Sequence, residues 1–63
     1  EGVTAFERAV ALEPDSVSAH RNLARAFLER HDPTAAGREA RAALRIDPRD
    51  QVSREILAVV VKD

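Results

Sequence analysis

The most informative stretch of the chain is residues 17–50, VSAHRNLARAFLERHDPTAAGREARAALRIDPRD, which contains two helical patterns and the turns that end them. In its first half, apolar residues recur at helical spacing at Leu23, Ala24, Phe27 and Leu28. Its second half carries a comparable stripe of smaller residues, namely Ala36, Ala40, Ala43 and Leu44. Two adjacent amphipathic helices are therefore predicted in this stretch.

Prolines mark the turns between the predicted helices, at Pro14, Pro33 and Pro48. Asp32 suits the N-cap of a helix whose first residue is Pro33, and either Asp15 or Ser16 suits the N-cap of the preceding helix. Alternating patterns and hairpin turns are missing from the sequence, so no strand pair is expected and the predicted fold class is all-α. The predicted helices span residues 1–13, 17–30, 33–46 and 51–62.

The helix–turn–helix pattern repeats when the sequence is shifted by 34 residues along itself. Small and turn-forming residues fall on similar residues, and so do several apolar ones. The matched pairs are Ala9 with Ala43, Leu12 with Ile46, Glu13 with Asp47, Pro14 with Pro48, Leu23 with Leu57, and Ala24 with Ala58. A fixed period of this length indicates a repeat protein.

This period, with two helices per unit, resembles the tetratricopeptide repeat. The resemblance is carried by His20-x-x-Leu23-Ala24-x-x-Phe27, where the family usually shows Trp-x-x-Leu-Gly-x-x-Tyr, and then by Ala36, Ala43 and Pro48. Two positions depart from the family pattern, because His20 replaces a tryptophan and Ala40 replaces an aromatic residue. Both replacements reduce the apolar volume of the expected core.

The resemblance implies a division of the whole chain into parts of three repeats. Residues 1–16 correspond to the second helix of one repeat, residues 17–50 to a complete repeat, and residues 51–63 to the first helix of another. The implied architecture is a set of antiparallel helix–turn–helix units that form a fragment of a right-handed α-solenoid.

The resemblance also implies a function in protein–protein interaction, because the first helices of such repeats line a concave groove that holds peptides. The implied groove residues are Ser18, Arg21, Asn22, Arg25, Glu29, Val52, Glu55, Ile56 and Val59. Among these, Asn22 is expected to hydrogen-bond a ligand backbone, since an amide both donates and accepts. The alternative is that Asn22 is an ordinary solvated residue on an exposed helix face.

The charged residues of this face have two interpretations. Arg21 and Arg25 lie four residues apart and could bind the carboxylates of an acidic peptide, or Arg25 could instead pair with Glu29. A clamp for an acidic C-terminus is not expected, because the fourth helix offers Val52 and Ile56 where such a clamp needs basic side chains. An apolar groove floor or packing surface is expected there instead.

A second hypothesis is self-association of the chain. A single repeat with flanking helices buries less surface than a repeat array normally requires. Leu57, Val60 and Val61 on the last helix are patterned to meet a further helix, so they are the candidates for contact with a second copy.

The composition argues against several other classes of function. The chain has 63 residues and a formal net charge of -1, which does not fit a dedicated nucleic-acid binder or a polybasic membrane binder. It has no cysteine, which excludes disulfides and cysteine-based metal sites. The apolar run from Ile56 to Val61 is far shorter than the about 20 residues that a membrane span needs. The arginine and alanine bias suggests a bacterial source, for which the cytoplasm is the default compartment.

Neither catalysis nor a cofactor or metal site is expected. His20 falls at a packing position and His31 in a turn, so neither has the converging partners of a general base or a metal site. The stripe formed by Arg38, Arg41 and Arg45 is expected to be a solvated face, because no aromatic residues are interleaved with it. The expected partner is a protein, a peptide or a second copy of the chain.

Overall fold

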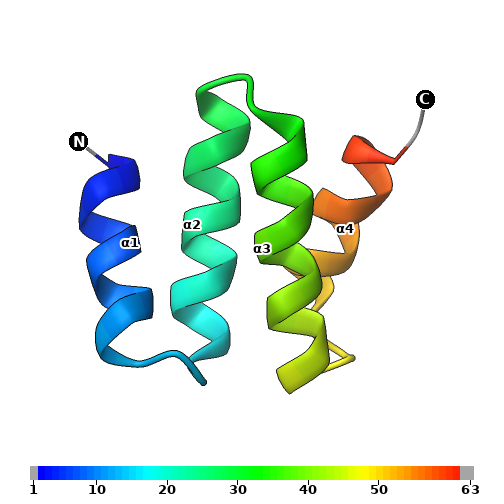
Figure 1. The fold of residues 1–63 in the computed structure, drawn as a ribbon. Coiled ribbons are helices and arrows are strands. Elements are labelled where there is room, and N and C mark those ends of the chain that lie inside the picture. The colour runs from blue at the N-terminus through cyan, green and yellow to red at the C-terminus, as the bar shows by residue number, and fades with distance from the viewer. Residues whose placement is uncertain (1, 62–63) are drawn as a thin grey trace.

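The computed structural model describes residues 2–61 and contains four helices that run in alternating directions (Figure 1). They are α1 (Gly2–Leu12), α2 (Val17–Glu29), α3 (Pro33–Ile46) and α4 (Gln51–Val60). No strand is present in these residues, which confirms the predicted all-α class. The predicted bounds of α3 are correct, and α1 and α2 each end one residue earlier than predicted. The predicted outer ends at Glu1 and Lys62 lie outside the described residues.

Side-chain caps begin three of the four helices. The backbone N–H of Ala19 donates to Ser16 Oγ at 3.1 Å, which selects Ser16 over Asp15 as the N-cap of α2. Asp32 caps α3 in the same way, directly before Pro33. Asp50 caps α4. Each cap satisfies a backbone donor that the first helical turn leaves without a partner.

The 34-residue period is visible in the backbone hydrogen bonds of the turns. The N–H of Glu13 donates to Ala9 O at 2.9 Å, and the N–H of Asp47 donates to Ala43 O at the same distance. The next bond of the turn also recurs, from Ser16 N–H to Glu13 O and from Asp50 N–H to Asp47 O, at 3.0 and 3.1 Å. The α1–α2 and α3–α4 turns are therefore built in the same way, one period apart.

The α2–α3 turn differs from these two turns. His31 has a φ of 62°, in the left-handed region that most L residues avoid. Its N–H donates to Leu28 O, and the N–H of Asp32 donates to Phe27 O, both at 2.9 Å. This pair of bonds is the Schellman motif that ends many helices, with a histidine at the position where glycine is usual.

The helices form a thin, open-ended row. The structure measures 32 × 25 × 13 Å along its principal axes, and the last value is close to the diameter of about 10 Å of a single helix. The most extensive contact joins α2 to α3, and α4 packs on α3 and, less extensively, on α2. Within the described residues, α1 contacts only α2. Figure 1 shows α1 and α4 at opposite sides of the row.

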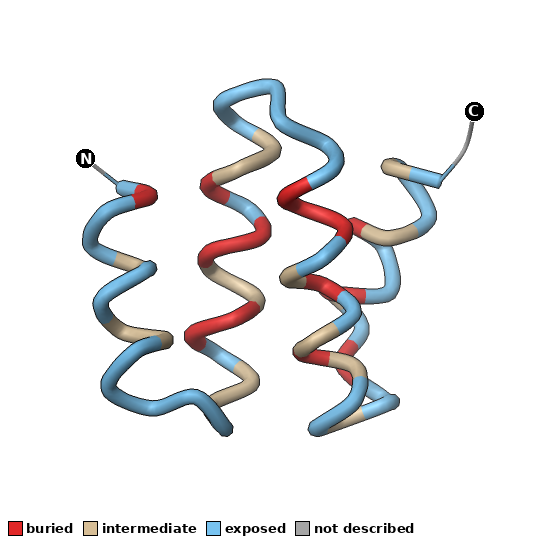
Figure 2. Tube along the Cα trace, in the orientation of Figure 1, coloured by how far each residue is buried: buried red, intermediate tan, exposed pale blue. Residues whose placement is uncertain are grey.

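Burial is concentrated on α2 and α3, as Figure 2 shows. One cluster combines Ala24 of α2 with α3 and with Ile56 of α4; its α3 members are Ala36 and Ala40. A second cluster combines Val3 of α1 with Leu23 and Ala26 of α2. The small residues let the helices approach closely, and larger half-buried residues, Phe27 among them, fill the space between the clusters.

Candidate functional site

A hollow of about 230 Å³ lies between α1 and α2, on the side of the molecule where ligand contacts were predicted. It is lined by Gly2, Phe6, Asn22, Arg25, Ala26 and Glu29. Phe6 is half-buried against the second core cluster, and Ala26 is buried in it, so the floor of the hollow is apolar. Asn22, Arg25 and Glu29 supply a polar edge to this floor.

The polar edge of the hollow retains unused hydrogen-bonding groups. Arg25 and Glu29 are exposed, and the ion pair considered between them does not form among the described residues. Asn22 is half-buried, and its side chain has no hydrogen-bond partner in the described part of the chain. These three residues can therefore present an amide, a cation and a carboxylate to a partner.

Arg21 has a different role from its neighbour Arg25. Its Nη1 donates to Asp50 Oδ1 at 2.6 Å, and its Nη2 donates to Ser18 Oγ at 3.1 Å. The ion pair joins α2 to the cap of α4, so Arg21 is a structural residue that holds neighbouring helices together. Ser18 itself is exposed at the edge of this contact.

Asp50 is buried and holds the centre of this network. Burial on its own raises the pKa of a carboxyl group, but hydrogen bonding by Ser53 and the Arg21 guanidinium outweighs it. The pKa of Asp50 therefore lies below its ordinary value of 3.8. The carboxylate is ionised at neutral pH and serves both as helix cap and as ion-pair partner.

The predicted groove residues of α4 divide between the interior and the surface. Ile56 was expected to lie at a groove floor or on a packing surface, and its burial fits the packing surface. Its core cluster also contains Ala24 of α2 and two α3 residues, Ala36 and Ala40, because α4 packs mainly on α3 and less extensively on α2. Val52 is half-buried against the same cluster. Glu55 is exposed and accepts a hydrogen bond from Gln51, and Val59 is exposed by 62%.

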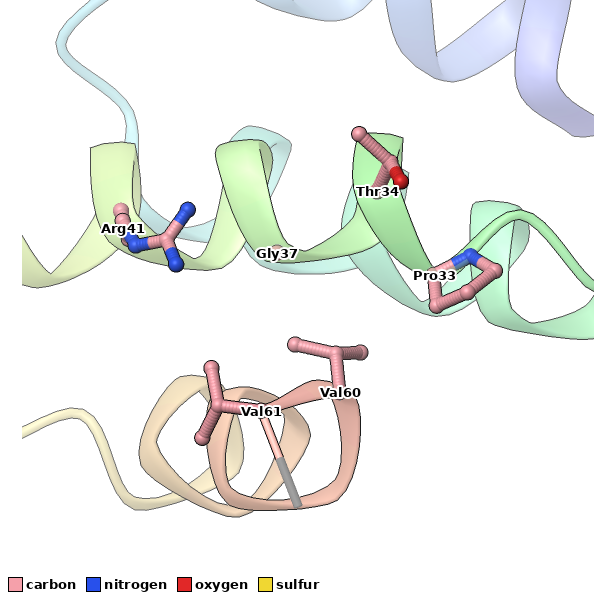
Figure 3. Close-up of a pocket in the computed structure, with 6 residues that line it drawn as sticks. All are labelled: Pro33, Thr34, Gly37, Arg41, Val60 and Val61. Carbon is pink, nitrogen blue, oxygen red and sulfur yellow. The ribbon is translucent and has the colours of Figure 1, made fainter. Parts of the chain in front are cut away.

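The three self-association candidates also differ from one another. Leu57 and Val60 are half-buried and pack on the first core cluster, so α3 already covers the part of α4 that they occupy. Val61 is exposed by 56%. In Figure 3, Val60 and Val61 face Gly37 and Arg41 of α3 across a shallow hollow of about 260 Å³.

His20 is buried, as its packing position predicted, and both of its ring nitrogens are used inside the fold. Nε2 donates to Pro14 O at 2.7 Å, and Nδ1 lies 2.8 Å from Glu39 Oε1. The ring thus links the α1–α2 turn to α3. His31 is exposed in the α2–α3 turn.

The other charged and metal-binding candidates form no further site among residues 2–61. Arg38, Arg41 and Arg45 are exposed on α3, as expected for a solvated stripe. No group of three or more potential metal ligands occurs in this part of the chain. None of the described helices is long and apolar enough to cross a membrane.

Three lining residues of the hollow, Gly2, Phe6 and Ala26, were not predicted as site residues. Phe6 lies at helical spacing from Val3 and Val10, as a core residue does, and neither Gly2 nor Ala26 carries a side chain that indicates a site. The 34-residue shift offers a signal for two of them, since Gly2 matches Ala36 and Phe6 matches Ala40. Both of those α3 residues are fully buried.

Comparison with known proteins found no matching family model, no matching curated protein and no matching solved structure.

Proposed function

We propose that this chain is a tetratricopeptide-like helical unit and that it acts as a protein-interaction scaffold, with a peptide or helical segment of a partner bound in the hollow between α1 and α2. The proposed tetratricopeptide-like arrangement is supported by helix starts and ends that recur at a fixed spacing. α2 begins at Val17 and α4 at Gln51, while α1 ends at Leu12 and α3 at Ile46. Both pairs are separated by 34 residues, as the turn hydrogen bonds are.

The observation that carries the proposal is the combination of an apolar floor with unpaired polar groups at its edge. Phe6 and Ala26 can contact an apolar side chain of the bound segment. Asn22 can donate to and accept from a peptide backbone, which fixes the direction and register of that segment. Arg25 and Glu29 can select charged side chains on either side of it.

The surface proposed for partner contact continues onto α4. Val59 lies 34 residues after Arg25 and is exposed at the equivalent position of the repeat. Glu55, which is also exposed, lies 34 residues after Arg21. A partner longer than the hollow would therefore meet a mixed apolar and acidic surface on the next helix.

The role is proposed to be binding and not catalysis. The buried histidine, His20, has both ring nitrogens within hydrogen-bonding distance of protein oxygens, so it is not free to act as a general base. No cofactor is assigned to the hollow. Its lining offers shape, apolar contact and hydrogen bonds, which are the requirements for recognising a peptide.

The experiment that tests this proposal begins with selection of peptides from a displayed library on the immobilised chain. A selected peptide is then titrated against the wild type, Asn22→Ala, Arg25→Ala and the control Arg38→Ala, whose side chain is exposed on α3. Asn22→Ala is expected to weaken binding by about five- to tenfold, since it removes hydrogen bonds to the ligand. The control should bind like the wild type. Equal affinity for all four chains would reject the hollow as the binding site.

A further inference from the structure

Inside the chain, α2 packs on α3 and α4. The hollow between α1 and α2 corresponds to the surface of α3 and α4 in this contact, and the outer face of α4 corresponds to the face of α2. We infer that the hollow receives α4 of a second copy, so that chains join head to tail. This inference rests on the proposed function, because it names the occupant of the same hollow.

The internal contact is the packing of α2 on α3 and α4. Ala24 of α2 is fully buried in one cluster with Ala36 and Ala40 of α3 and Ile56 of α4. Phe27, one helical turn after Ala24, packs on the same cluster. The inserted helix thus contributes Ala24 and Phe27, and the receiving pair of helices contributes the other three residues.

The receiving half of this contact recurs 34 residues earlier. Ala36, Ala40 and Ile56 match Gly2, Phe6 and Asn22 in the repeat. All three of the matching residues line the hollow, and no helix among residues 2–61 fills it. The hollow is therefore the equivalent, on α1 and α2, of the surface that α2 covers on α3 and α4.

The inserting half of the contact recurs 34 residues later, on α4. Ala24 matches Ala58, and Phe27 matches Val61. Ala58 and Val61 are both exposed, although their counterparts on α2 are buried and half-buried. The outer face of α4 therefore presents the pattern that fits the receiving surface, and no other helix among residues 2–61 covers it.

The side-chain volumes of the two halves compensate each other. The receiving surface gains volume where Phe6 replaces Ala40, and the inserting face loses volume where Val61 replaces Phe27. The two changes therefore partly offset each other in the volume that a close-packed contact has to hold. Asn22 replaces Ile56 and reduces the apolar area, so the contact between chains is expected to be weaker than the internal one.

The geometry of the row allows this contact to repeat. α1 and α4 lie at opposite sides of the molecule (Figure 1). A hollow at one side and an inserting helix at the other form a heterologous contact, which leaves a free hollow and a free α4 on every dimer. Assembly therefore continues into longer rows as the concentration rises. A symmetric α4–α4 dimer would stop at two chains.

The test uses two variants that each block one side. Gly2→Glu places a charged side chain at a residue that lines the hollow, and a Cβ atom at this position would meet nothing within 4 Å. Ala58→Glu places one on the exposed face of α4. Arg38→Glu, at an exposed position of α3, serves as a stringent charge control, because it changes the net charge by more than either blocking variant does. Circular dichroism is used to check that each variant retains the helicity of the wild type.

Solution mass is measured by light scattering over about a hundredfold range of concentration. The wild type and Arg38→Glu should increase in mass with concentration, and each blocked variant alone should stay monomeric, with association weakened by about tenfold or more. An equimolar mixture of Gly2→Glu and Ala58→Glu should form a 1:1 dimer and nothing larger. The α4 of Gly2→Glu enters the hollow of Ala58→Glu, and the hollow and α4 that stay free in this dimer are the two blocked ones.

Three outcomes would overturn the inference. They are a wild type that remains monomeric throughout, a blocked variant that still dimerises alone, and a mixture of the two variants that stays monomeric. The peptide titration is a separate measurement. Peptide binding lost in Gly2→Glu together with a monomeric wild type would support the proposed function and reject the second copy as the occupant. Assembly without peptide capture would support the second copy as the occupant.

Discussion

Val60 of α4 lies directly against Gly37 of α3, so close that a Cβ atom at residue 37 would stand 3.1 Å from Val60 Cγ2. One period earlier, the matching residues are Val3 on α1 and Ala26 on α2, which share a buried cluster. In the α1–α2 interface the larger residue, Val3, is on the first of the two helices. In the α3–α4 interface the larger residue, Val60, is on the second. Gly37 is required by the close approach of α4, while its backbone φ is an ordinary helical one.

This exchange predicts compensation between residues 37 and 60. Gly37→Val alone should lower the free energy of unfolding by about 1–3 kcal/mol, because the added side chain overpacks the interface. Adding Val60→Ala to the same chain recreates the arrangement of Val3 and Ala26 and should recover most of the loss. Urea denaturation of the wild type, both single variants and the double variant gives the coupling energy.

The control for this cycle is Gly2→Val, which introduces the same side chain where nothing lies within 4 Å. Its effect should be small compared with that of Gly37→Val. Simple additivity of Gly37→Val and Val60→Ala would contradict the proposed compensation, since residues in contact are expected to couple.

Leu23 is expected to be the most sensitive large apolar residue of α2. It is only 3% exposed and packs in the cluster that joins α1 to α2. Leu23→Ala should cost about 2–5 kcal/mol, which is a large part of the stability available to so small a domain. Leu12→Ala removes the same groups at a position that is 76% exposed and should change stability by less than about 0.5 kcal/mol.

Thermal unfolding followed by circular dichroism would compare these two leucine variants. If Leu23→Ala were as helical as the wild type and unfolded cooperatively at the same transition temperature, the assignment of this residue to the core would be contradicted. The same measurement on Phe27→Ala should show a loss, because Phe27 packs on both core clusters.

His31 should be a position where glycine improves stability. Its φ of 62° is unfavourable for a residue with a Cβ atom, and glycine adopts this conformation without that cost. His31→Gly is expected to raise the free energy of unfolding by about 0.5–1 kcal/mol. The neighbouring Arg30 has a φ of -90°, so Arg30→Gly gains nothing from glycine's freedom and should be neutral or destabilising. A denaturation midpoint that falls in His31→Gly would argue against strain in this turn.

Acid should destabilise the chain through Asp50. Its folded-state pKa lies below 3.8, so the folded protein binds fewer protons than the unfolded chain in the range between the two pKa values. The contribution of Asp50 is therefore present above about pH 4 and declines as the pH falls through the folded-state pKa. Denaturant unfolding as a function of pH measures this decline.

The comparison variant for the acid experiment is Asp50→Asn, which keeps the size of the side chain and removes the titrating group. It should be less stable than the wild type at neutral pH, because it loses the ion pair with Arg21. Its stability should also change less between pH 6 and pH 3 than that of the wild type. A parallel decline in both chains would assign the acid sensitivity to other carboxyl groups.

Local features of this chain followed from the sequence because they depend on residues close together along it. Ser16 and Asp32 cap helices at the places their side chains indicated, and Pro33 begins α3. The 34-residue period was also readable, since the turns and several small and apolar residues recur at this spacing along the sequence. These elements fixed the all-α class and three of the four helix starts, at residues 17, 33 and 51.

The three-dimensional packing decided which positions of the repeat are buried. Asn22 and Ile56 occupy matching positions, yet Ile56 is buried in a cluster with α2 and α3 residues while Asn22 borders an open hollow. The Arg21–Asp50 ion pair joins residues 29 apart in sequence, and its partner could not be inferred from spacing within one helix. Helical periodicity specifies the face of each residue, whereas burial of that face depends on the neighbouring helix that covers it.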